Sequence, residues 1–408
     1  MMSRVKKTLW LKALTFTLSS LLFVVCFGLT LELWARIQNS KNKTYGILNW
    51  SNHDILGWIP TTGKGTSVTE EFEAHYDINS YGMNDKPLEE SLLISKTKIM
   101  ALGDSHTFAA GVSQDETWPN VLEEILFKND IKRGSVYNCA VSGYNLGQYL
   151  LQMRRLAGVI KPGIVLIGFT TASDLYDLIP PRKGGFIFGA DRSRVYFDLD
   201  ENGNLIELHD LAGKKIHPNQ SRNVSLITKV KNLFSSSAFF QRFKRSNLAM
   251  WVMIRFRPKG KTLWASPDTA LAKKLDDEYL FRWKLAEAII AKIAQEARQK
   301  DIKVVLISIP YLPQVYDTVW ESTFGRYPEQ YDRWIAGERL KGICARAGIY
   351  YIDLTTKFVE VARKQKEWLH YPIDSHPNPE GHRLIAQTVA DFLLEHKLAG
   401  SPELKKEQ

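Results

Sequence analysis

The sequence predicts an α/β fold in three layers, with a parallel β-sheet covered by helices on both faces. From residue 97 on, short apolar runs alternate with longer amphipathic segments. Strands buried on both faces give such apolar runs, and the alternation is typical of βαβ units. The composition agrees: 408 residues with 44% apolar and 24% charged side chains exclude disordered, collagen-like and coiled-coil classes.

The expected strands and helices follow one another along the chain. We expect buried strands at residues 98–102, 136–140, 164–168, 304–309 and 349–353, and helices at 118–128, 146–160, 276–300, 334–347 and 379–396. The last helix has the clearest start, because Asn378 is a suitable N-cap and Pro379 fits the first turn.

The amino-terminal segment is predicted to cross a membrane. Residues 13–31 contain no charge, and as a helix they would span roughly 28 Å. Basic residues precede the run, which places residues 1–12 in the cytoplasm, a transmembrane anchor at 13–34, and the rest outside the cytoplasm, in the periplasm or at the cell surface. A cleaved signal peptide is the alternative, disfavoured by the length of the run and by Glu32-Leu33-Trp34 after it.

The remaining domain boundaries follow from changes in pattern. We expect an irregular leading segment at 39–96, an α/β domain at 97–180 and 271–398, an insertion at 181–270, and a tail at 399–408. The insertion includes a β-hairpin, with strands at 195–199 and 205–208, and a basic region at 211–267.

The basic region carries twelve Lys and Arg and no Asp or Glu, so the net charge of +10 is local. It fits an anionic lipid surface or, alternatively, a solvated cover over the core. No nucleic-acid-binding motif accompanies it, so no nucleic acid is expected as a partner.

Two short motifs carry candidate chemistry. Gly103-Asp104-Ser105 follows an expected strand, and the carboxyl ends of strands are where open α/β sheets bind ligands. Asp374-Ser375-His376 precedes the last helix. A histidine can accept a serine proton while a carboxylate holds its ring. Each motif alone also has a structural interpretation, since Ser105 and His376 could simply cap helices.

Together the motifs resemble those of the SGNH/GDSL hydrolase family. Ser105 matches the nucleophile, and Asp374 and His376 match the acid and base, in a DxH spacing like that of membrane-associated polysaccharide acetyltransferases. Residues 138–145 resemble the second family block, in which Gly143 takes the position whose backbone N–H helps to form the oxyanion hole with that of Ser105. Residues 77–84 look like the lead-in of a bacterial branch of the family.

The resemblance covers about residues 77–180 and 276–396. It implies a three-layer flavodoxin-like SGNH fold. To this fold the charge-free run adds an N-terminal transmembrane helix, and the long gap between the third and fourth strands adds a large insertion that the resemblance does not explain.

One family block departs from the pattern. Where the family has Gly-x-Asn-Asp, with the asparagine amide as an oxyanion donor, this chain reads from Gly168 to Asp174 as GFTTASD. Ser173 takes the asparagine position in the alignment that we prefer. Thr171, Asn145 and Asp104 are further candidates for supporting the oxyanion or the substrate. Losing one donor costs on the order of 100-fold to 1000-fold in rate.

The resemblance implies a serine ester hydrolase that acts on acyl esters of a lipid or glycan, and the predicted anchor would make it extracytoplasmic and membrane-anchored. One alternative is an O-acyltransferase that modifies a cell-surface polysaccharide with the same triad and needs a membrane acyltransferase partner or another acyl donor. The other is a catalytically weakened scaffold that binds glycan or lipid. Membrane contact is expected through the N-terminal helix and the basic region.

No metal or organic cofactor is expected. The three cysteines, Cys26, Cys139 and Cys344, are too scattered for a zinc site or a disulfide framework.

Overall fold

The computed structural model describes residues 4–41, 49–69, 71–128, 130, 132–179, 195–208, 270–325, 327–364 and 368–399. The chain divides into two compact units, residues 1–43 with 219–259 and residues 44–218 with 260–408. Of the first unit, only helix α1 (Arg4–Lys41) falls in the described residues.

The second unit is built on a five-stranded parallel sheet. Its strands are β5 (Thr97–Gly103), β6 (Gly134–Asn138), β7 (Ile164–Thr170), β10 (Lys303–Ile309) and β11 (Tyr350–Asp353). Their order across the sheet is β11-β10-β7-β5-β6, and every neighbouring pair is parallel. This is the flavodoxin-like strand order. All five expected strands and their parallel pairing are therefore confirmed.

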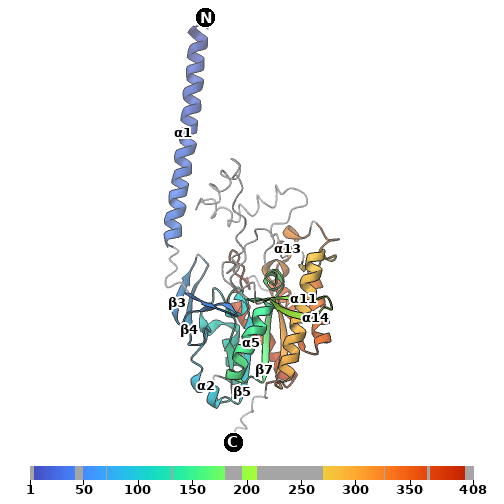
Figure 1. Cartoon of the computed structure of the whole chain (residues 1–408). Coiled ribbons are helices and arrows are strands. Elements are labelled where there is room, and N and C mark those ends of the chain that lie inside the picture. The colour runs from blue at the N-terminus through green and yellow to red at the C-terminus, as the bar shows by residue number, and fades with distance from the viewer. Residues whose placement is uncertain are drawn as a thin grey trace. The chain divides into compact units, whose positions relative to one another are not determined.

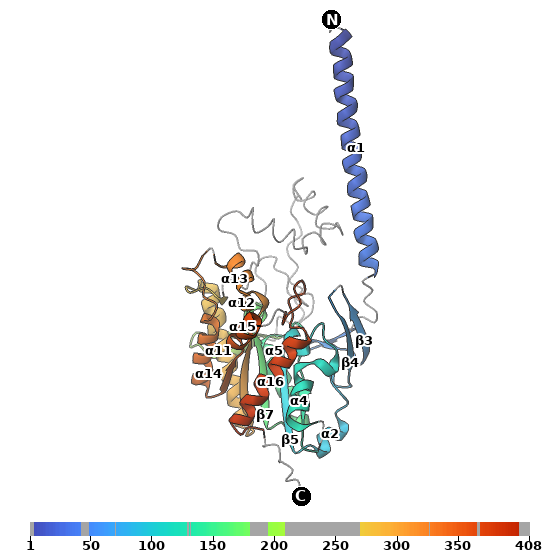
Figure 2. The same cartoon turned by 180° about the vertical axis from the view of Figure 1, so that it is seen from behind.

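Helices cover both faces of the sheet (Figures 1 and 2). One apolar core contains buried residues of α5 (Leu146–Ile160), α11 (Asp277–Arg298) and α14 (Ile335–Ala347). The core on the other face contains residues of α4 (Trp118–Phe127), α15 (Thr355–Lys364) and α16 (Pro379–Glu395). Successive residues of β5 alternate between the two cores, as the pleat of a strand requires. The three expected layers are present.

The residues before β5 are more ordered than the sequence suggested. They form two antiparallel hairpins, β1 (Trp50–His53) with β2 (Gly57–Pro60) and β3 (Gly63–Val68) with β4 (Glu73–Ile78), followed by α2 (Glu89–Ile94). In the insertion, β8 (Tyr196–Leu199) and β9 (Leu205–Leu208) form the hairpin that the sequence predicts.

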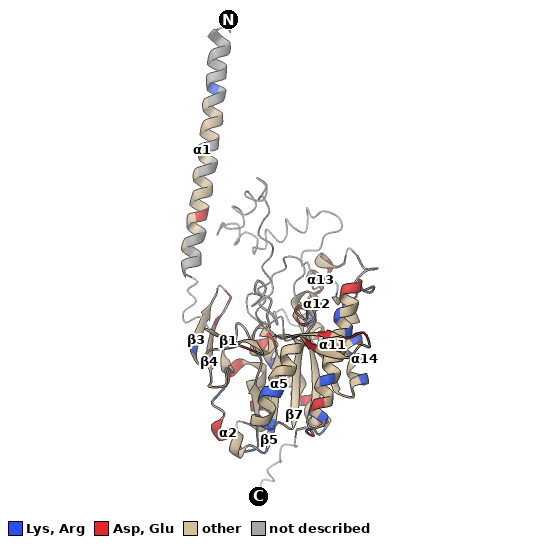
Figure 3. Ribbon diagram, viewed as in Figure 1, with Lys and Arg blue, Asp and Glu red and all other residues tan. Residues whose placement is uncertain are grey.

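The shorter elements lie at the carboxyl ends of the parallel strands or in the connections after them. They are α3 (Ser105–Phe108), a 3₁₀ turn at Gln114–Glu116, α6 (Thr171–Asp174), α12 (Leu312–Val315) and α13 (Asp317–Thr323). The basic region at 211–267 lies outside the described residues. In the described part, charged residues lie mainly on the helices and connections, and the central strands carry few (Figure 3).

Helix α1 corrects one prediction from the sequence. It is a single helix of 38 residues, so it continues beyond the charge-free run at both ends and takes in the charged residues there. Among the described residues, no helix unites the length with the apolar character that crossing a bilayer requires. The predicted transmembrane anchor at 13–34, and with it the single-pass location that placed the α/β domain outside the cytoplasm, is therefore corrected.

Candidate active site

Ser105 is the first residue of α3 and directly follows Asp104 at the carboxyl end of β5. Asp104 is the N-cap, and its Oδ1 accepts the backbone N–H of His106 at 2.9 Å. Two glycines let α3 begin this close to the sheet. A Cβ on Gly103 would lie 2.2 Å from Thr107 Oγ1, and one on Gly168 would lie 2.1 Å from the same atom. Because Gly103 and Gly168 leave room for Thr107, helix α3 packs directly on the sheet and Ser105 lies at the sheet edge.

His376 and Asp374 meet Ser105 from the loop before α16. His376 Nε2 lies 2.8 Å from Ser105 Oγ, although the two residues are 271 positions apart, and His376 Nδ1 lies 2.5 Å from Asp374 Oδ1. Two backbone bonds close the loop: Tyr371 N–H donates to the His376 carbonyl at 2.9 Å, and Ser375 N–H to the Tyr371 carbonyl at 2.8 Å. The structure therefore brings together the three residues expected to form the relay.

The electrostatics of this trio suit proton transfer. Burial lowers the pKa of His376, but the hydrogen bond and charge of Asp374 outweigh it and raise the pKa above its ordinary value of 6.5. Burial raises the pKa of Asp374, but the hydrogen bonds and charge of His376, together with the charge of His106, outweigh this, so the net pKa is lowered. Asp374 thus stays ionised and stabilises a protonated His376.

Two backbone donors are available to a developing oxyanion. In the part of the chain that the structure describes, neither the N–H of Ser105 nor that of Gly143 donates a hydrogen bond. Gly143 has φ +79 and follows β6, the neighbour of β5 in the sheet. An unpaired N–H at the edge where the nucleophile lies is the feature that an oxyanion hole needs.

Ser173 points elsewhere. Its hydroxyl donates to Asp104 Oδ2 at 2.5 Å, and Thr170 Oγ1 lies 3.5 Å from Oδ1 of the same carboxylate. Asp104 is 1% exposed. Burial raises its pKa, but His106 and Ser173 outweigh this and lower it. Asp104 is thus an ionised anchor within the fold, and the one hydroxyl proton of Ser173 is directed at it and away from a substrate.

Asn145 is hydrogen-bonded inside the fold, and Thr171 is buried in it. Asn145 Oδ1 caps α5 by accepting the Gln148 N–H at 3.2 Å, and its Nδ2 donates to the Asp177 carbonyl at 2.6 Å. Thr171 begins α6 and is 1% exposed. This geometry does not favour Asn145 as a donor to the oxyanion.

Two residues near the site carried no strong sequence signal. The ring of His106 lies 4.8 Å from that of His376, and its Nδ1 lies 3.4 Å from Asp104 Oδ1. Its position next to Ser105 is the signal that could have found it. Glu71 contacts the loop of His376 from the turn after β3. Nothing in the sequence around Glu71 marks this contact.

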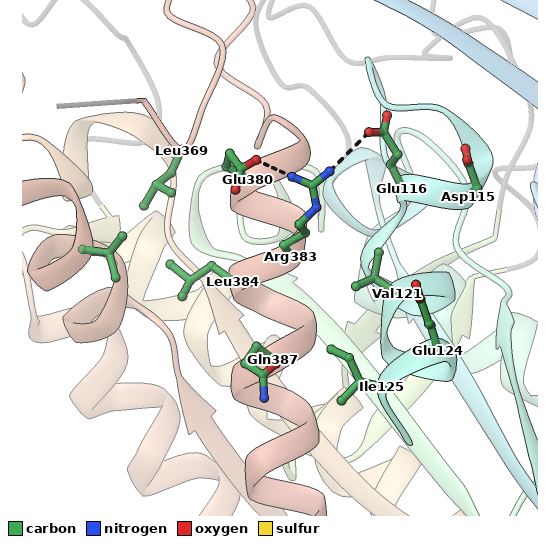
Figure 4. A pocket seen from close by; sticks show the side chains of 11 residues that line it. Asp115, Glu116, Val121, Glu124, Ile125, Leu369, Glu380, Arg383, Leu384 and Gln387 are labelled. Carbon is green, nitrogen blue, oxygen red and sulfur yellow. Dashed lines mark hydrogen bonds and ion pairs between the residues drawn. The ribbon is translucent and has the colours of Figure 1, made fainter. Parts of the chain in front are cut away.

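A cavity of about 710 Å³ lies apart from the relay, between α4 and α16 (Figure 4). Arg383 crosses it and pairs with Glu380 and, at 3.6 Å, with Glu116. Ser105, His376 and Asp374 do not line this cavity. In the described residues, no group of three His, Cys, Asp or Glu side chains is arranged to hold a metal ion.

No protein-family model matches the chain, and no curated protein matches it. Solved structures do. TesA is 12% identical, with 73% of this chain and 98% of that chain covered and a TM-score of 0.35. The psychrotrophic esterase EstA from Pseudoalteromonas sp. is 13% identical (74% and 100% covered, TM-score 0.35).

The acetylxylan esterase Axe2 from Geobacillus stearothermophilus, solved as a catalytic mutant, is also 13% identical (76% and 96% covered, TM-score 0.37). Likeness of this size carries no argument about chemistry, which has to come from the side chains themselves.

Proposed function

We propose that the protein is a serine ester hydrolase that acts on acyl esters of a lipid or glycan through an acyl-enzyme. The observation that supports the proposal best is the continuous relay from Ser105 Oγ to His376 Nε2 at 2.8 Å and from His376 Nδ1 to Asp374 Oδ1 at 2.5 Å. A serine hydroxyl is a weak nucleophile at neutral pH, and an adjacent base with an orienting carboxylate is what activates it.

In the first half-reaction, Ser105 Oγ attacks the ester carbonyl carbon while His376 Nε2 takes its proton. The oxyanion accepts hydrogen bonds from the N–H groups of Ser105 and Gly143. When the tetrahedral intermediate collapses, the bond to the leaving oxygen breaks. His376 returns the proton to that oxygen, which releases the alcohol and leaves an ester on Ser105.

In the second half-reaction, His376 takes a proton from water as the water oxygen attacks the acyl-enzyme. The bond to Ser105 Oγ then breaks, and the proton returns to Oγ, so that a free acid is released and the enzyme is restored. If a sugar hydroxyl takes the place of water, the same steps give an O-acyltransferase, and only the second product differs.

The test compares wild type with Ser105→Ala and with Ser51→Ala, a serine on the exposed face of β1. Wild type and Ser51→Ala should hydrolyse an activated acetyl ester and label with a fluorophosphonate, whereas Ser105→Ala should lose both by several orders of magnitude. Product analysis with an added oligosaccharide separates free acid from a transferred ester. A wild type that neither labels nor hydrolyses would contradict the proposal and favour a binding scaffold. A Ser105→Ala variant that still does both would contradict it by showing that another residue is the nucleophile.

A further inference from the structure

The turn between β3 and β4 is tightly built. Thr69 N–H donates to the Phe72 carbonyl at 2.8 Å, and Thr69 Oγ1 accepts the N–H groups of Glu71 at 3.1 Å and Phe72 at 3.2 Å. A threonine hydroxyl that accepts backbone N–H groups in this way fixes the local chain direction. The position of Glu71 is therefore set by the hairpin itself.

The carboxylate of Glu71 grips the loop that carries the acid and the base. Its Oε1 accepts the backbone N–H of Ile373 at 2.9 Å, and its Oε2 accepts that of Asp374 at 2.7 Å. Both contacts are charge-assisted, and hydrogen bonds of this kind are roughly twice as strong as neutral ones. Two adjacent peptide groups held by the two oxygens of one carboxylate leave the backbone at Asp374 little freedom.

Further contacts join the same hairpin to both halves of the site. The ring of Phe72 packs on that of Tyr371 with centroids 4.9 Å apart. Tyr371 Oη donates to the Gly111 carbonyl at 2.9 Å, while Gly111 N–H donates to Tyr76 Oη, on β4, at 2.8 Å. Gly111 follows α3, so the hairpin contacts the segment of the nucleophile as well as the loop of the base.

The connection between Asp374 and His376 is too short and too restricted in conformation to compensate for a shift of the backbone. A single residue, Ser375, separates acid from base, and it has φ +74, a left-handed conformation that is uncommon for a residue other than glycine. A displacement of the Asp374 backbone therefore moves the carboxylate that orients His376.

We propose that Glu71 is a positioning residue for the proton relay. By accepting the N–H groups of Ile373 and Asp374, it keeps the Asp374 carboxylate within hydrogen-bond distance of His376 Nδ1. The inference rests on the proposed function, in which that pair activates Ser105. Its chemistry is hydrogen bonding alone, since Glu71 touches neither Ser105 Oγ nor His376 in the described contacts.

The pKa of His376 measures how closely the Asp374 carboxylate is held to His376, and it can be measured without turnover. Asp374 on its own loop and Asp104 at the start of α3 raise it. The ring of His106 lies 4.8 Å from that of His376, and the charge of His376 in turn lowers the pKa of the buried His370 and His382. Burial lowers the pKa of His376, and Asp374 is the strongest group that raises it. A looser Asp374 should therefore lower it.

The experiment uses the full chain with Glu71→Gln, Glu71→Asp and the matched control Glu73→Gln. Glu73 lies two residues further along the same hairpin, where, among the described residues, its carboxylate reaches only the exposed His75, at 3.7 Å. For Glu71→Gln we expect kcat on an activated ester to fall on the order of 10- to 100-fold with KM within about twofold of wild type. We also expect a lower His376 pKa in an NMR titration, with the signal assigned from its loss in His376→Gln.

Glu71→Asp keeps the charge but has a shorter reach, so it should lose part of kcat, and Glu73→Gln should match wild type in kcat and pKa. If Glu71→Gln does not fold by circular dichroism, Glu71→Asp decides by the same two measurements. A folded Glu71 variant with the kcat and His376 pKa of wild type would overturn the inference. If wild type hydrolyses no ester, the proposed function fails, and the titration alone still decides on positioning.

Discussion

The hydroxyl of Ser173 is committed to Asp104, which changes what its loss should do. Asp104 is a buried, ionised carboxylate whose hydrogen-bond donors include Ser173 at 2.5 Å and the backbone of His106 at 2.9 Å. A buried charge that loses a donor is left partly unpaired, and a loss of this kind is seen first in stability. Ser173 thus acts on the nucleophile indirectly: its hydroxyl bonds Asp104, and Asp104 caps the helix that starts with Ser105.

We therefore predict that Ser173→Ala lowers the free energy of unfolding by about 1–3 kcal/mol, since it removes a donor from a buried carboxylate. In contrast to the loss of an oxyanion donor, which costs on the order of 100-fold to 1000-fold in rate, kcat should fall less than about 10-fold. Urea unfolding and ester hydrolysis measure the two effects, and Ser173→Thr, which keeps a hydroxyl, serves as the control. A large loss of kcat at unchanged stability would contradict this prediction and show that Ser173 is a donor to the oxyanion.

Single residues differ in how far the sequence could predict them. Ser105, Asp374 and His376 could be found because the chemistry restricts residue type and local spacing. The direction of the Ser173 hydroxyl could not, since alignment gives a position and no orientation. Glu71 was missed because it acts on backbone N–H groups 302 and 303 residues away, and any sequence there would offer them.

At the level of elements, α3 is seated by two glycines on neighbouring strands. Gly103 and Gly168 are paired across β5 and β7, and Thr107 fills the space that their missing side chains leave. The nucleophile is carried on a helix whose height above the sheet depends on this contact.

We predict that Gly168→Ala raises α3 from the sheet, because the added Cβ would lie 2.1 Å from Thr107 Oγ1. Misplacement of a reacting group by about 1 Å can cost on the order of 100-fold, so kcat should fall by about that factor. Overpacking should also lower the free energy of unfolding by about 1–3 kcal/mol. Gly158→Ala in α5, where a Cβ meets nothing within 4 Å, should leave kcat unchanged. Equal behaviour of the two variants would show that α3 adapts to the extra atom.

Periodicity in the sequence identified the elements that bury a long apolar face. Helix α5 was predicted with the bounds that it has, and a capping box at Asn145 explains its clear start. The hairpin of β3 and β4 was missed because β3 does not alternate between buried and exposed side chains and neither strand is a continuous apolar run. Helix α15 was missed as well.

On the scale of the whole molecule, buried titratable groups couple folding to pH. His370 and His382 are both 0% exposed, and burial lowers the pKa of each to about 3. In the unfolded chain they take up protons below about pH 6.5, so each contributes stability above that pH that is lost on acidification. Asp85 acts in the opposite sense, since burial raises its pKa to about 7. A comparison of variants is needed to isolate one group.

We predict that His382→Asn weakens the acid sensitivity of folding. The asparagine carbonyl can still accept the Trp118 N–H that His382 Nδ1 accepts at 3.2 Å. Between about pH 7 and pH 5, the loss of unfolding free energy should be smaller in the variant by about 2 kcal/mol. Urea unfolding at both pH values measures it, with the exposed His75→Asn as control. The same pH dependence in His382→Asn and wild type would mean that His382 is protonated in the folded state.

At this scale the parallel sheet could be predicted from short apolar runs, because strands covered on both faces are apolar along most of their length. The same kind of observation misled at the amino end. There the charge-free run was taken as the extent of the helix, whereas α1 continues through the charged residues that flank it.

The separation of Ser105 from His376 by 271 positions has a consequence for biosynthesis. A nascent chain that has left the ribosome as far as β7 already carries its nucleophile, but no base can reach it until the loop before α16 has also emerged. The proposed ester hydrolysis therefore cannot occur while the domain is being translated, and it begins only after the loop before α16 has folded against the sheet.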